Sequence, residues 1–310
     1  MSRLVRIGTR SSKLALAQVA EVYLSLSSLL DNIKLEVVPI KTSGDIHHSA
    51  KLSTIGGKGL FIKELEQALL ENTIDIAVHS SKDLPPILHS QTVLSAITER
   101  INPFDVVISH HKIKSFVDLP KKAVIGTSSP RRSAFLKKLL PTCTIVDLRG
   151  NIDTRIAKLQ QQNFDAIVLA MAGLTRINQD HLAQYVFSES EMLPSVGQGC
   201  LALQTRINDS EIQQIASAIN NHQSNICFTA EREFIATMQG DCFTPMASFA
   251  TINNNSLTLK TAIISSCGLE YNFQQLNTNI ISHQEAINLG KTLALKTKNE
   301  APSLWQKISS

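Results

Sequence analysis

Two turns of the sequence combine glycine, threonine, small hydroxyl residues and bases. Residues 8–13 read GTRSSK and residues 126–132 read GTSSPRR. Each turn follows an apolar run and precedes a helical pattern, so its N–H groups and hydroxyls lie at a helix N-terminus, which favours anions. Arginine forks bind carboxylates through paired hydrogen bonds, and Arg149, Arg155 and Arg176 add to the set. Any one of these bases alone is equally explained as a solvated surface residue. Their recurrence predicts an anionic ligand with several carboxylates or phosphates.

Asp83 is the acidic residue best placed for chemistry. It follows Lys82 at the end of an apolar run and precedes a Leu-Pro-Pro segment. Its carboxylate is therefore expected at the sheet edge where α/β proteins bind ligands. Capping the turn is the commoner role for an aspartate in such a position. Among so many bases, however, the carboxylate would suit a transient cation on a ligand whose anionic groups the bases hold.

The cysteines predict reduced thiols. They are odd in number and lack C-x-x-C spacing, which disfavours a disulfide framework or a zinc site. Cys242 lies in a loop between a long helix and a strand, where its thiol is expected to be exposed. The other four lie in apolar or mixed stretches and are predicted to be buried: Cys143, Cys200, Cys227 and Cys267.

Spacing disfavours several other sites. Residues 56–59 (GGKG) do not form a Walker loop, because Gly59 stands where Ser or Thr is required. They predict either a mobile lid that carries Lys58 to the ligand or a plain flexible loop. No metal is expected at residues 47–48 or 110–111, because adjacent histidines on an extended chain point in opposite directions.

Composition predicts a globular protein. The 310 residues are 43% hydrophobic and 18% charged, and the net charge of +4 is too small to imply nucleic acid by itself. The longest apolar run, residues 166–174, is shorter than the roughly 20 residues that span a bilayer. The basic N-terminus resembles a transit peptide, but residues 4–9 already predict a strand. We therefore expect a cytoplasmic protein.

Hydrophobic spacing predicts alternating strands and helices. Strands are expected at residues 4–9, 35–40 and 74–78, with a helix after the first strand and another before the third. Ser11 or Ser12 is the expected N-cap of the first helix. The apolar faces of the two helices are Ala15, Val19, Val22, Leu26 and Leu29 in the first, and Phe61, Leu65, Ala68 and Leu69 in the second.

The pattern then restarts. Residues 124–132 (VIGTSSPRR) echo residues 5–13 (VRIGTRSSK), and residues 165–174 (DAIVLAMAGL) echo residues 75–84 (DIAVHSSKDL). The echoes occur in the same order, which indicates two related βα domains of the α/β class. Such domains would face each other across a cleft, with the ligand at the C-terminal ends of the strands.

From about residue 220 the layout changes to a long helix, strands near residues 247–252 and 257–264, and a helix after His283. This predicts a small α+β third domain. The long helix has an apolar face of Ile226, Ala230, Phe234 and Met238. The predicted domains are residues 1–98 with 200–219, residues 104–193, and residues 220–310, with linkers at 99–104 and 193–199.

An ordered series of motifs makes the chain similar to one enzyme family. The motifs are RIGTR (6–10), GGKGLFIKELE (56–66), AVHSSKDLP (77–85), IGTSSPRR (125–132), LRGN (148–151), VGQG (196–199), TAER (229–232) and GDC (240–242). The motifs are spread over most of the chain, and only the stretch after about Pro245 is unremarkable. They resemble the hydroxymethylbilane synthases, also called porphobilinogen deaminases, of tetrapyrrole biosynthesis.

The resemblance implies two domains similar to periplasmic binding proteins and a third that carries a covalent cofactor. It implies a transferase of porphyrin (heme) biosynthesis that deaminates four porphobilinogen molecules and joins them head to tail on a dipyrromethane cofactor. Hydrolysis then releases hydroxymethylbilane. The cofactor is made from substrate and attached through a thioether to the cysteine matching Cys242. The aspartate matching Asp83 stabilises the methylene-pyrrole cation that forms as ammonia leaves, and takes part in proton transfer.

The resemblance also implies partners for the carboxylate groups of the pyrroles. The residues expected at the cofactor are Cys242, Lys82, Asp83, Ser12, Thr127, Ser128, Ser129, Arg131, Arg132, Arg155 and Gln198. The residues expected at the substrate are Arg10, Arg149, Arg155, Arg176 and Lys58. Porphobilinogen is the expected partner, with no metal, nucleic acid or membrane, and the resemblance favours a monomer.

The chain departs from the family pattern at Asp241, where a glycine usually precedes the cofactor cysteine. The extra negative charge would raise the pKa of the thiol and slow attachment. Two other readings stay open. A cytosolic two-lobed protein could bind small anions in the same cleft without catalysis, and an acyl-transfer enzyme could use Cys242 as a free nucleophile if a base lay near it.

Overall fold

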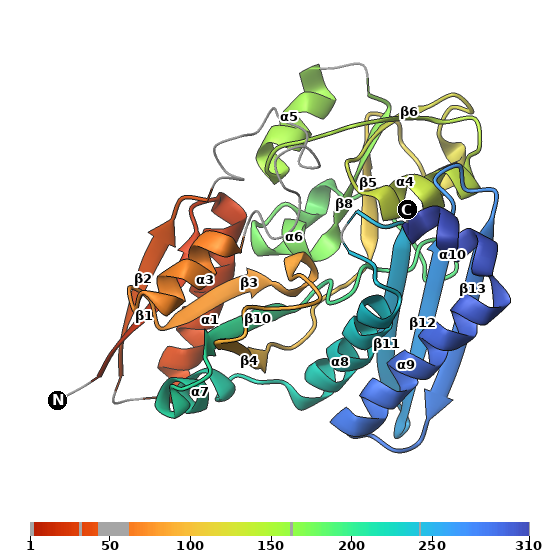
Figure 1. The fold of residues 1–310 in the computed structure, drawn as a ribbon. Helices are drawn as coiled ribbons and strands as arrows, with labels where there is room; N and C mark the ends of the chain where they lie inside the picture. The colour runs from red at the N-terminus through yellow and green to blue at the C-terminus, as the bar shows by residue number, and fades with distance from the viewer. Residues whose placement is uncertain (1–2, 31–32, 43–61, 162–163, 242, 310) are drawn as a thin grey trace. The chain divides into compact units, whose positions relative to one another are not determined.

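The computed structural model describes residues 3–30, 33–42, 62–161, 164–241 and 243–309. The chain divides into two units, residues 1–100 with 200–225 and residues 101–199 with 226–310 (Figure 1). The predicted linkers, 99–104 and 193–199, contain neither helix nor strand. Among the described helices, none combines the length and apolar character that crossing a lipid bilayer requires.

The first unit contains a five-stranded sheet with the strand order β2-β1-β3-β10-β4. β1 pairs in parallel with both β2 and β3, whereas β10 is antiparallel to β3 and β4. The elements are β1 (Arg3–Arg10), α1 (Lys13–Leu29), β2 (Ile33–Ile40), α3 (Lys63–Leu70), β3 (Ile76–Ser80), the 3-10 turn η1 (Ser81–Asp83), β4 (Thr92–Ile97), β10 (Leu201–Arg206) and α7 (Ser210–Ser217).

The second unit repeats this topology in the order β7-β6-β8-β5-β9. β6 pairs in parallel with β7 and β8, and β5 is antiparallel to β8 and β9, so β6 corresponds to β1 and β8 to β3. The elements are β5 (Asp105–Ser109), η2 (Phe116–Asp118), β6 (Val124–Gly126), α4 (Pro130–Leu139), β7 (Thr144–Val146), α5 (Ile152–Gln161), β8 (Ala166–Ala170), α6 (Met171–Arg176), η3 (Asp180–Leu182) and β9 (Tyr185–Val186).

An aspartate precedes the central strand of each sheet in the same way. The Asp75 backbone N donates to Arg6 O (2.8 Å), and its carboxylate accepts from Arg6 N (2.9 Å). The Asp165 backbone N donates to Val124 O (2.8 Å), and its carboxylate accepts from Val124 N (2.7 Å). The sequence echo is therefore a structural repeat, and the prediction of two related halves is confirmed.

The rest of the second unit is an antiparallel sheet with the order β11-β12-β13, packed with helices (Figure 1). One core cluster joins this sheet to the five-stranded sheet, because Phe249 of β11 and Phe135 of α4 are buried with Val168 of β8. The elements are α8 (His222–Thr237), β11 (Met246–Asn253), β12 (Ser256–Ile264), β13 (Tyr271–Thr278), α9 (His283–Glu300) and α10 (Pro302–Ser309).

Local predictions are confirmed for most elements and wrong in detail for some. Ser12 is the N-cap of α1, because its side chain accepts from Ala15 N at 3.3 Å. Leu29 was expected on the buried face but is 58% exposed, because it lies in the last turn of the helix. β3 begins at Ile76, two residues later than predicted. β13 and α10 were not predicted, because β13 alternates exposed with half-buried residues, many of them polar.

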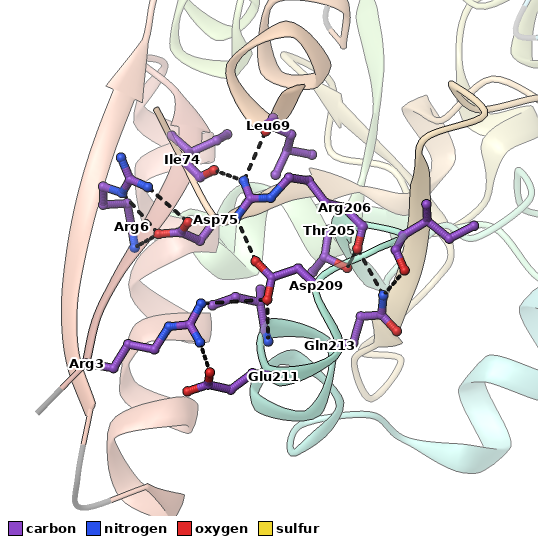
Figure 2. Close-up of polar contacts among 12 residues, drawn as sticks. Arg3, Arg6, Leu69, Ile74, Asp75, Thr205, Arg206, Asp209, Glu211 and Gln213 are labelled. Atoms are coloured by element: carbon purple, nitrogen blue, oxygen red, sulfur yellow. Dashed lines mark hydrogen bonds and ion pairs between the residues drawn. The ribbon is translucent and has the colours of Figure 1, made fainter. Parts of the chain in front are cut away.

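Asp75 also pairs with two arginines (Figure 2). Arg6 Nη2 and Arg206 Nη2 donate to Oδ1 at 3.0 and 2.9 Å, and Arg206 Nη1 donates to the carbonyls of Leu69 and Ile74. Burial raises the pKa of Asp75, but the hydrogen bonds from Arg6 and Arg206 outweigh burial and hold the pKa below its ordinary value. The cluster therefore ties together three neighbouring strands, β1, β3 and β10.

Asp75→Asn should lower the free energy of unfolding at pH 7 by about 2 to 3 kcal/mol. This is less than the roughly 3 to 5 kcal/mol expected for breaking a fully buried ion pair, because Arg6 is one-third exposed. Urea denaturation measures the change. Glu270→Gln is the control, because it removes an exposed ion pair with Lys307 and should cost less than about 1 kcal/mol. Equal losses in the two variants would contradict this account.

Candidate active site

A pocket opens in the first unit where β1 and β3 end. These parallel neighbours pair Gly8 with Ala77, so their C-terminal ends lie at the same sheet edge. Three predicted site residues line the pocket: Arg10 ends β1, Ser12 caps α1, and Asp83 ends the η1 turn. The structure thus brings together a guanidinium, a hydroxyl and a carboxylate that are far apart in the sequence.

The η1 turn presents the carboxylate of Asp83. Backbone bonds close the turn, since Leu84 N donates to Ser81 O (3.3 Å) and Ser81 N donates to Cys200 O (3.1 Å). Within the described part of the chain, no backbone N–H donates to the exposed carboxylate of Asp83, so it does not cap its own turn there. Lys82 precedes it and is half-buried.

Two further lining residues were missed by the sequence analysis. Gln18 Nε2 donates to Ser80 Oγ at 2.7 Å. Gln18 is only 6% exposed, although its neighbours on the buried stripe of α1 are apolar. A lone amide within such a stripe was the available signal, because a buried amide requires a polar partner.

His79 is a third missed lining residue. Its Nε2 lies 3.0 Å from Gln204 Oε1, an acceptor, so the neutral ring carries its proton on Nε2. Burial lowers the pKa of His79 to about 4; the bond to Gln204 opposes this shift, and the charge of Arg10 adds to it. The ring is therefore neutral at pH 7 beside the pocket.

The low pKa of His79 predicts a pH-dependent stability. The folded state binds fewer protons than the unfolded state between pH 4 and 6.5, so the free energy of unfolding should fall as the pH drops through this window. The full effect is about 3 kcal/mol. Urea denaturation from pH 7 to 4.5 should show a steeper loss in the wild type than in His79→Gln. Parallel profiles would contradict the assignment.

The second unit places three predicted hydroxyl residues at the start of α4. Thr127 N donates to Val146 O (3.0 Å), and Thr127 Oγ1 accepts from Ser129 N (3.2 Å). Ser129 is the N-cap, because its Oγ accepts from Arg132 N at 3.4 Å. Ser128 is exposed at the same turn. The turn corresponds to the one that carries Ser12 in the first unit.

The first turn of α4 carries Arg131 and Arg132, which are only 5% and 6% exposed. Both guanidiniums contact the carboxylate of Asp105: Arg131 Nη2 lies 2.7 Å from Oδ2, and Arg132 Nε donates to Oδ1 at 3.0 Å. Gln198 Nε2 donates to the same Oδ1 at 3.1 Å. Asp105 thus brings three predicted site residues together, and the sequence analysis did not single it out.

The remaining arginines of the second unit are held by oxygen atoms of nearby segments. Arg149 Nε donates to Asp147 Oδ2 (2.6 Å), and Arg155 Nε donates to the carbonyl of Gly150 (2.8 Å). Arg176 Nη2 donates to the carbonyl of Gly199 at 3.2 Å, next in sequence to Gln198. Arg149 and Arg155 therefore flank one turn, and Arg176 lies beside another.

The segment that contains Gln198 is also fixed by Glu231 of α8. This fully buried carboxylate accepts from Gly197 N through Oε2 and from Ala250 N through Oε1, both at 2.7 Å. Gly197 has φ +64°, a conformation that favours glycine. Glu231 lies in the TAER motif, but its role as a link between the helix, the turn and β11 was not predicted.

Several predicted features lie outside the described residues: Cys242, Lys58, the segment 56–59 and residues 47–48. Beside Cys242, the Asp241 carboxylate accepts from Phe243 N (2.9 Å) and from the hydroxyl of Thr244 (3.0 Å). Asp241 therefore caps a turn here, a role that glycine cannot fill.

Of the four cysteines predicted to be buried, three are buried and Cys267 is not. Cys267 lies in the exposed turn between β12 and β13, so the prediction was wrong for this residue. Its mixed sequence surroundings reflect a turn rather than a core. The hydrogen bond with Ser265 lowers the pKa of the Cys267 thiol.

The described adjacent histidines bond to protein atoms. His110 Nε2 lies 2.7 Å from the carbonyl of Leu159, and His111 Nε2 lies 3.0 Å from Asp165 Oδ1. The two rings thus face different partners.

Comparison with known proteins assigns the chain to a family. Residues 5–214 match the model of the porphobilinogen deaminase dipyrromethane cofactor binding domain, and residues 225–299 match the porphobilinogen deaminase C-terminal domain. The chain belongs to the porphobilinogen deaminase family. It is therefore an enzyme of porphyrin biosynthesis that uses a dipyrromethane cofactor, as the resemblance implied, and the non-catalytic binding protein is disfavoured.

Curated relatives named porphobilinogen deaminase support the same family assignment. A Wolbachia protein from Drosophila simulans is 43% identical over 95% of this chain and 99% of its own length. A Legionella pneumophila protein is 40% identical over 100% of this chain and 99% of its own length. Among solved structures, the methionine-binding protein MetQ is 15% identical, with a TM-score of 0.43 over 76% of this chain and 94% of its own.

The residues of a porphobilinogen deaminase must accommodate the carboxylates and the pyrrole N–H groups of dipyrromethane. The first unit offers Arg10 and Ser12 to carboxylates and Asp83 to N–H groups in one pocket. The second unit offers two guanidiniums that share a single carboxylate within the part of the chain that the structure describes, so the described cluster has surplus positive charge. The donor sets fit the cofactor.

Proposed function

We propose that this chain joins four porphobilinogen molecules on a dipyrromethane attached to Cys242, with Asp83 as its catalytic residue. The observation that carries the proposal is the pocket shared by Arg10, Ser12 and Asp83 at the ends of β1 and β3. When bound, the cofactor supplies the pyrrole end to which the substrate units are joined. Hydrolysis releases hydroxymethylbilane.

Asp83 stabilises a cationic intermediate and takes part in proton transfer. Loss of ammonia from porphobilinogen leaves a methylene-pyrrole cation, and a nearby carboxylate lowers the energy of that cation. The same carboxylate can accept a pyrrole N–H bond and take part in proton transfer. Arg10 stands in the same pocket and binds a substrate carboxylate, which fixes the substrate relative to Asp83.

The other predicted residues bind carboxylates and polar groups. We assign Lys82, Asp83, Ser12, Thr127, Ser128, Ser129, Arg131, Arg132, Arg155 and Gln198 to the cofactor, together with Cys242. We assign Arg10, Arg149, Arg155, Arg176 and Lys58 to the substrate. The buried Arg131 and Arg132 support the cofactor assignment, because surplus charge in a buried cluster attracts an anion.

We also propose that the enzyme is a cytoplasmic monomer with neither nucleic acid nor membrane among its partners. The small net charge of +4 agrees with this. The proposed domains are residues 1–98 with 200–219, 104–193 and 220–310. The cleft inferred from the sequence repeat stays a prediction.

Asp83→Asn should keep the fold and the cofactor while lowering turnover of porphobilinogen by at least about 100-fold, because the amide cannot balance the cation. Product formation measures turnover, and intact mass measures the cofactor. Asp180→Asn is a matched control, because Asp180 also lies in an exposed 3-10 turn but outside the pocket. Turnover near the wild-type rate in Asp83→Asn would remove this residue from its role.

Cys242→Ser should fold but gain no covalent pyrrole when porphobilinogen is added, because a hydroxyl is a far weaker nucleophile than a thiolate. Intact mass before and after addition checks this. The control is Cys267→Ser, which removes the exposed thiol that has a lowered pKa. This control should load as the wild type does. A Cys242→Ser protein with the full added mass would contradict the proposed attachment.

A further inference from the structure

We propose that Asp105 is a positioning residue for cofactor binding. It holds Arg131, Arg132 and Gln198 in one arrangement and leaves their combined charge unbalanced, so that a carboxylate of the cofactor completes the cluster. The inference rests on the proposed function, which assigns these three residues to the dipyrromethane.

Several residues of the second unit contact Asp105. Asp105 is fully buried at the start of β5, where it pairs with Ala170 of β8. Its Oδ2 contacts Arg131 Nη2 at 2.7 Å, and its Oδ1 contacts Arg132 Nη2 at 2.8 Å. Oδ1 also accepts from Gln198 Nε2, which donates in addition to the carbonyl of Pro103 at 2.6 Å.

Each guanidinium is oriented by a second contact. Arg131 Nη1 donates to the carbonyl of Leu193 at 2.7 Å, and Arg132 Nη1 donates to the carbonyl of Val168 at 2.8 Å. A carboxylate on one edge and a carbonyl on another fix the plane of each group. The two guanidinium groups therefore cannot rotate independently, because both contact the carboxylate of Asp105.

The charge of the cluster is what points to a ligand. Within the described residues, Asp105 is the only carboxylate paired with Arg131 or Arg132, so two cations share one anion. Burial lowers the pKa of Arg131, Asp105 opposes this shift, and the neighbouring charge of Arg132 adds to it. A further carboxylate would relieve it.

The cluster around Asp75 provides a contrast. Asp75 also holds two buried or half-buried arginines, but there Arg206 pairs with a second carboxylate, Asp209, at 2.8 Å (Figure 2). Asp75 precedes β3, whereas the pocket lies at the C-terminal end of that strand. One aspartate thus serves a balanced cluster away from the pocket, and the other serves an unbalanced cluster among the predicted cofactor residues.

The test compares cofactor loading in Asp105→Asn and the matched variant Asp75→Asn. Both changes remove one charge that two arginines share. Apo-protein is purified by size exclusion, its fold is checked by circular dichroism, and porphobilinogen is added. Intact mass then gives the fraction of folded protein that carries two linked pyrroles. Asp105→Asn should load less than one-tenth as much as the wild type, whereas Asp75→Asn should load fully despite its lower stability.

Asp105→Glu separates positioning from folding. It keeps the charge but displaces the carboxylate by one methylene, so it should reach full loading about five- to tenfold more slowly than the wild type. If Asp105→Asn yields no folded protein, this rate decides the matter. Loading at the wild-type rate and extent in the folded variant, or equal loss in Asp75→Asn, would overturn the inference. A wild type that gains no mass would overturn the proposed function as well.

Discussion

Guanidinium groups that leave water must find a counter-charge, and this constraint organises both units of the molecule. Asp75 precedes β3, the central strand of the first sheet, and Asp105 begins β5, which lies next to the central strand β8 of the second. Each aspartate pairs with two arginines at distances between 2.7 and 3.0 Å. Losing one partner of a buried ion pair leaves an uncompensated charge, which costs far more than the pair contributes. The carboxylates therefore decide where the arginines lie.

The repeated topology places similar groups of polar and charged residues at equivalent strand ends in the two units. The central strand of each five-stranded sheet has one parallel neighbour, β1 beside β3 and β6 beside β8, so the turns after β1 and after β6 follow the C-terminal ends of equivalent strands. In both units a serine caps the following helix and bases stand beside it. Hydroxyls, N–H groups and guanidiniums thus come together twice, which suits a cofactor and substrates that carry several carboxylates each. Asp83, the one carboxylate among the described residues that line the first pocket, then supplies the opposite charge that a cationic intermediate requires.

Most of the fold could be predicted from the sequence because local signals agree with the tertiary structure. The echo between residues 75–84 and 165–174 reflects two aspartates that make the same backbone contacts. Ser12 could be identified as a cap from its position before an apolar stripe. The strand β13 could not be predicted, because none of its residues is fully buried and the alternation of apolar and polar residues along it is weak.

The candidate site could be predicted only where motifs mark it. Arg10, Ser12 and Asp83 belong to motifs and lie in one pocket. Asp105 and His79 act through partners distant in sequence, Arg131 and Gln204, and no local pattern shows such partners. Cys267 was wrongly predicted to be buried for a related reason. A stretch of mixed polar and apolar residues does not show whether it packs in the core or forms an exposed turn.

The central claim is that this chain carries its own cofactor on one thiol. The most direct test is the intact mass of the purified wild-type protein, followed by peptide mapping across residues 233–250. We expect a mass excess of two linked pyrroles on the peptide that contains Cys242, either at purification or after porphobilinogen is added. A peptide that stays unmodified after that addition, in a protein shown to be folded, would contradict it.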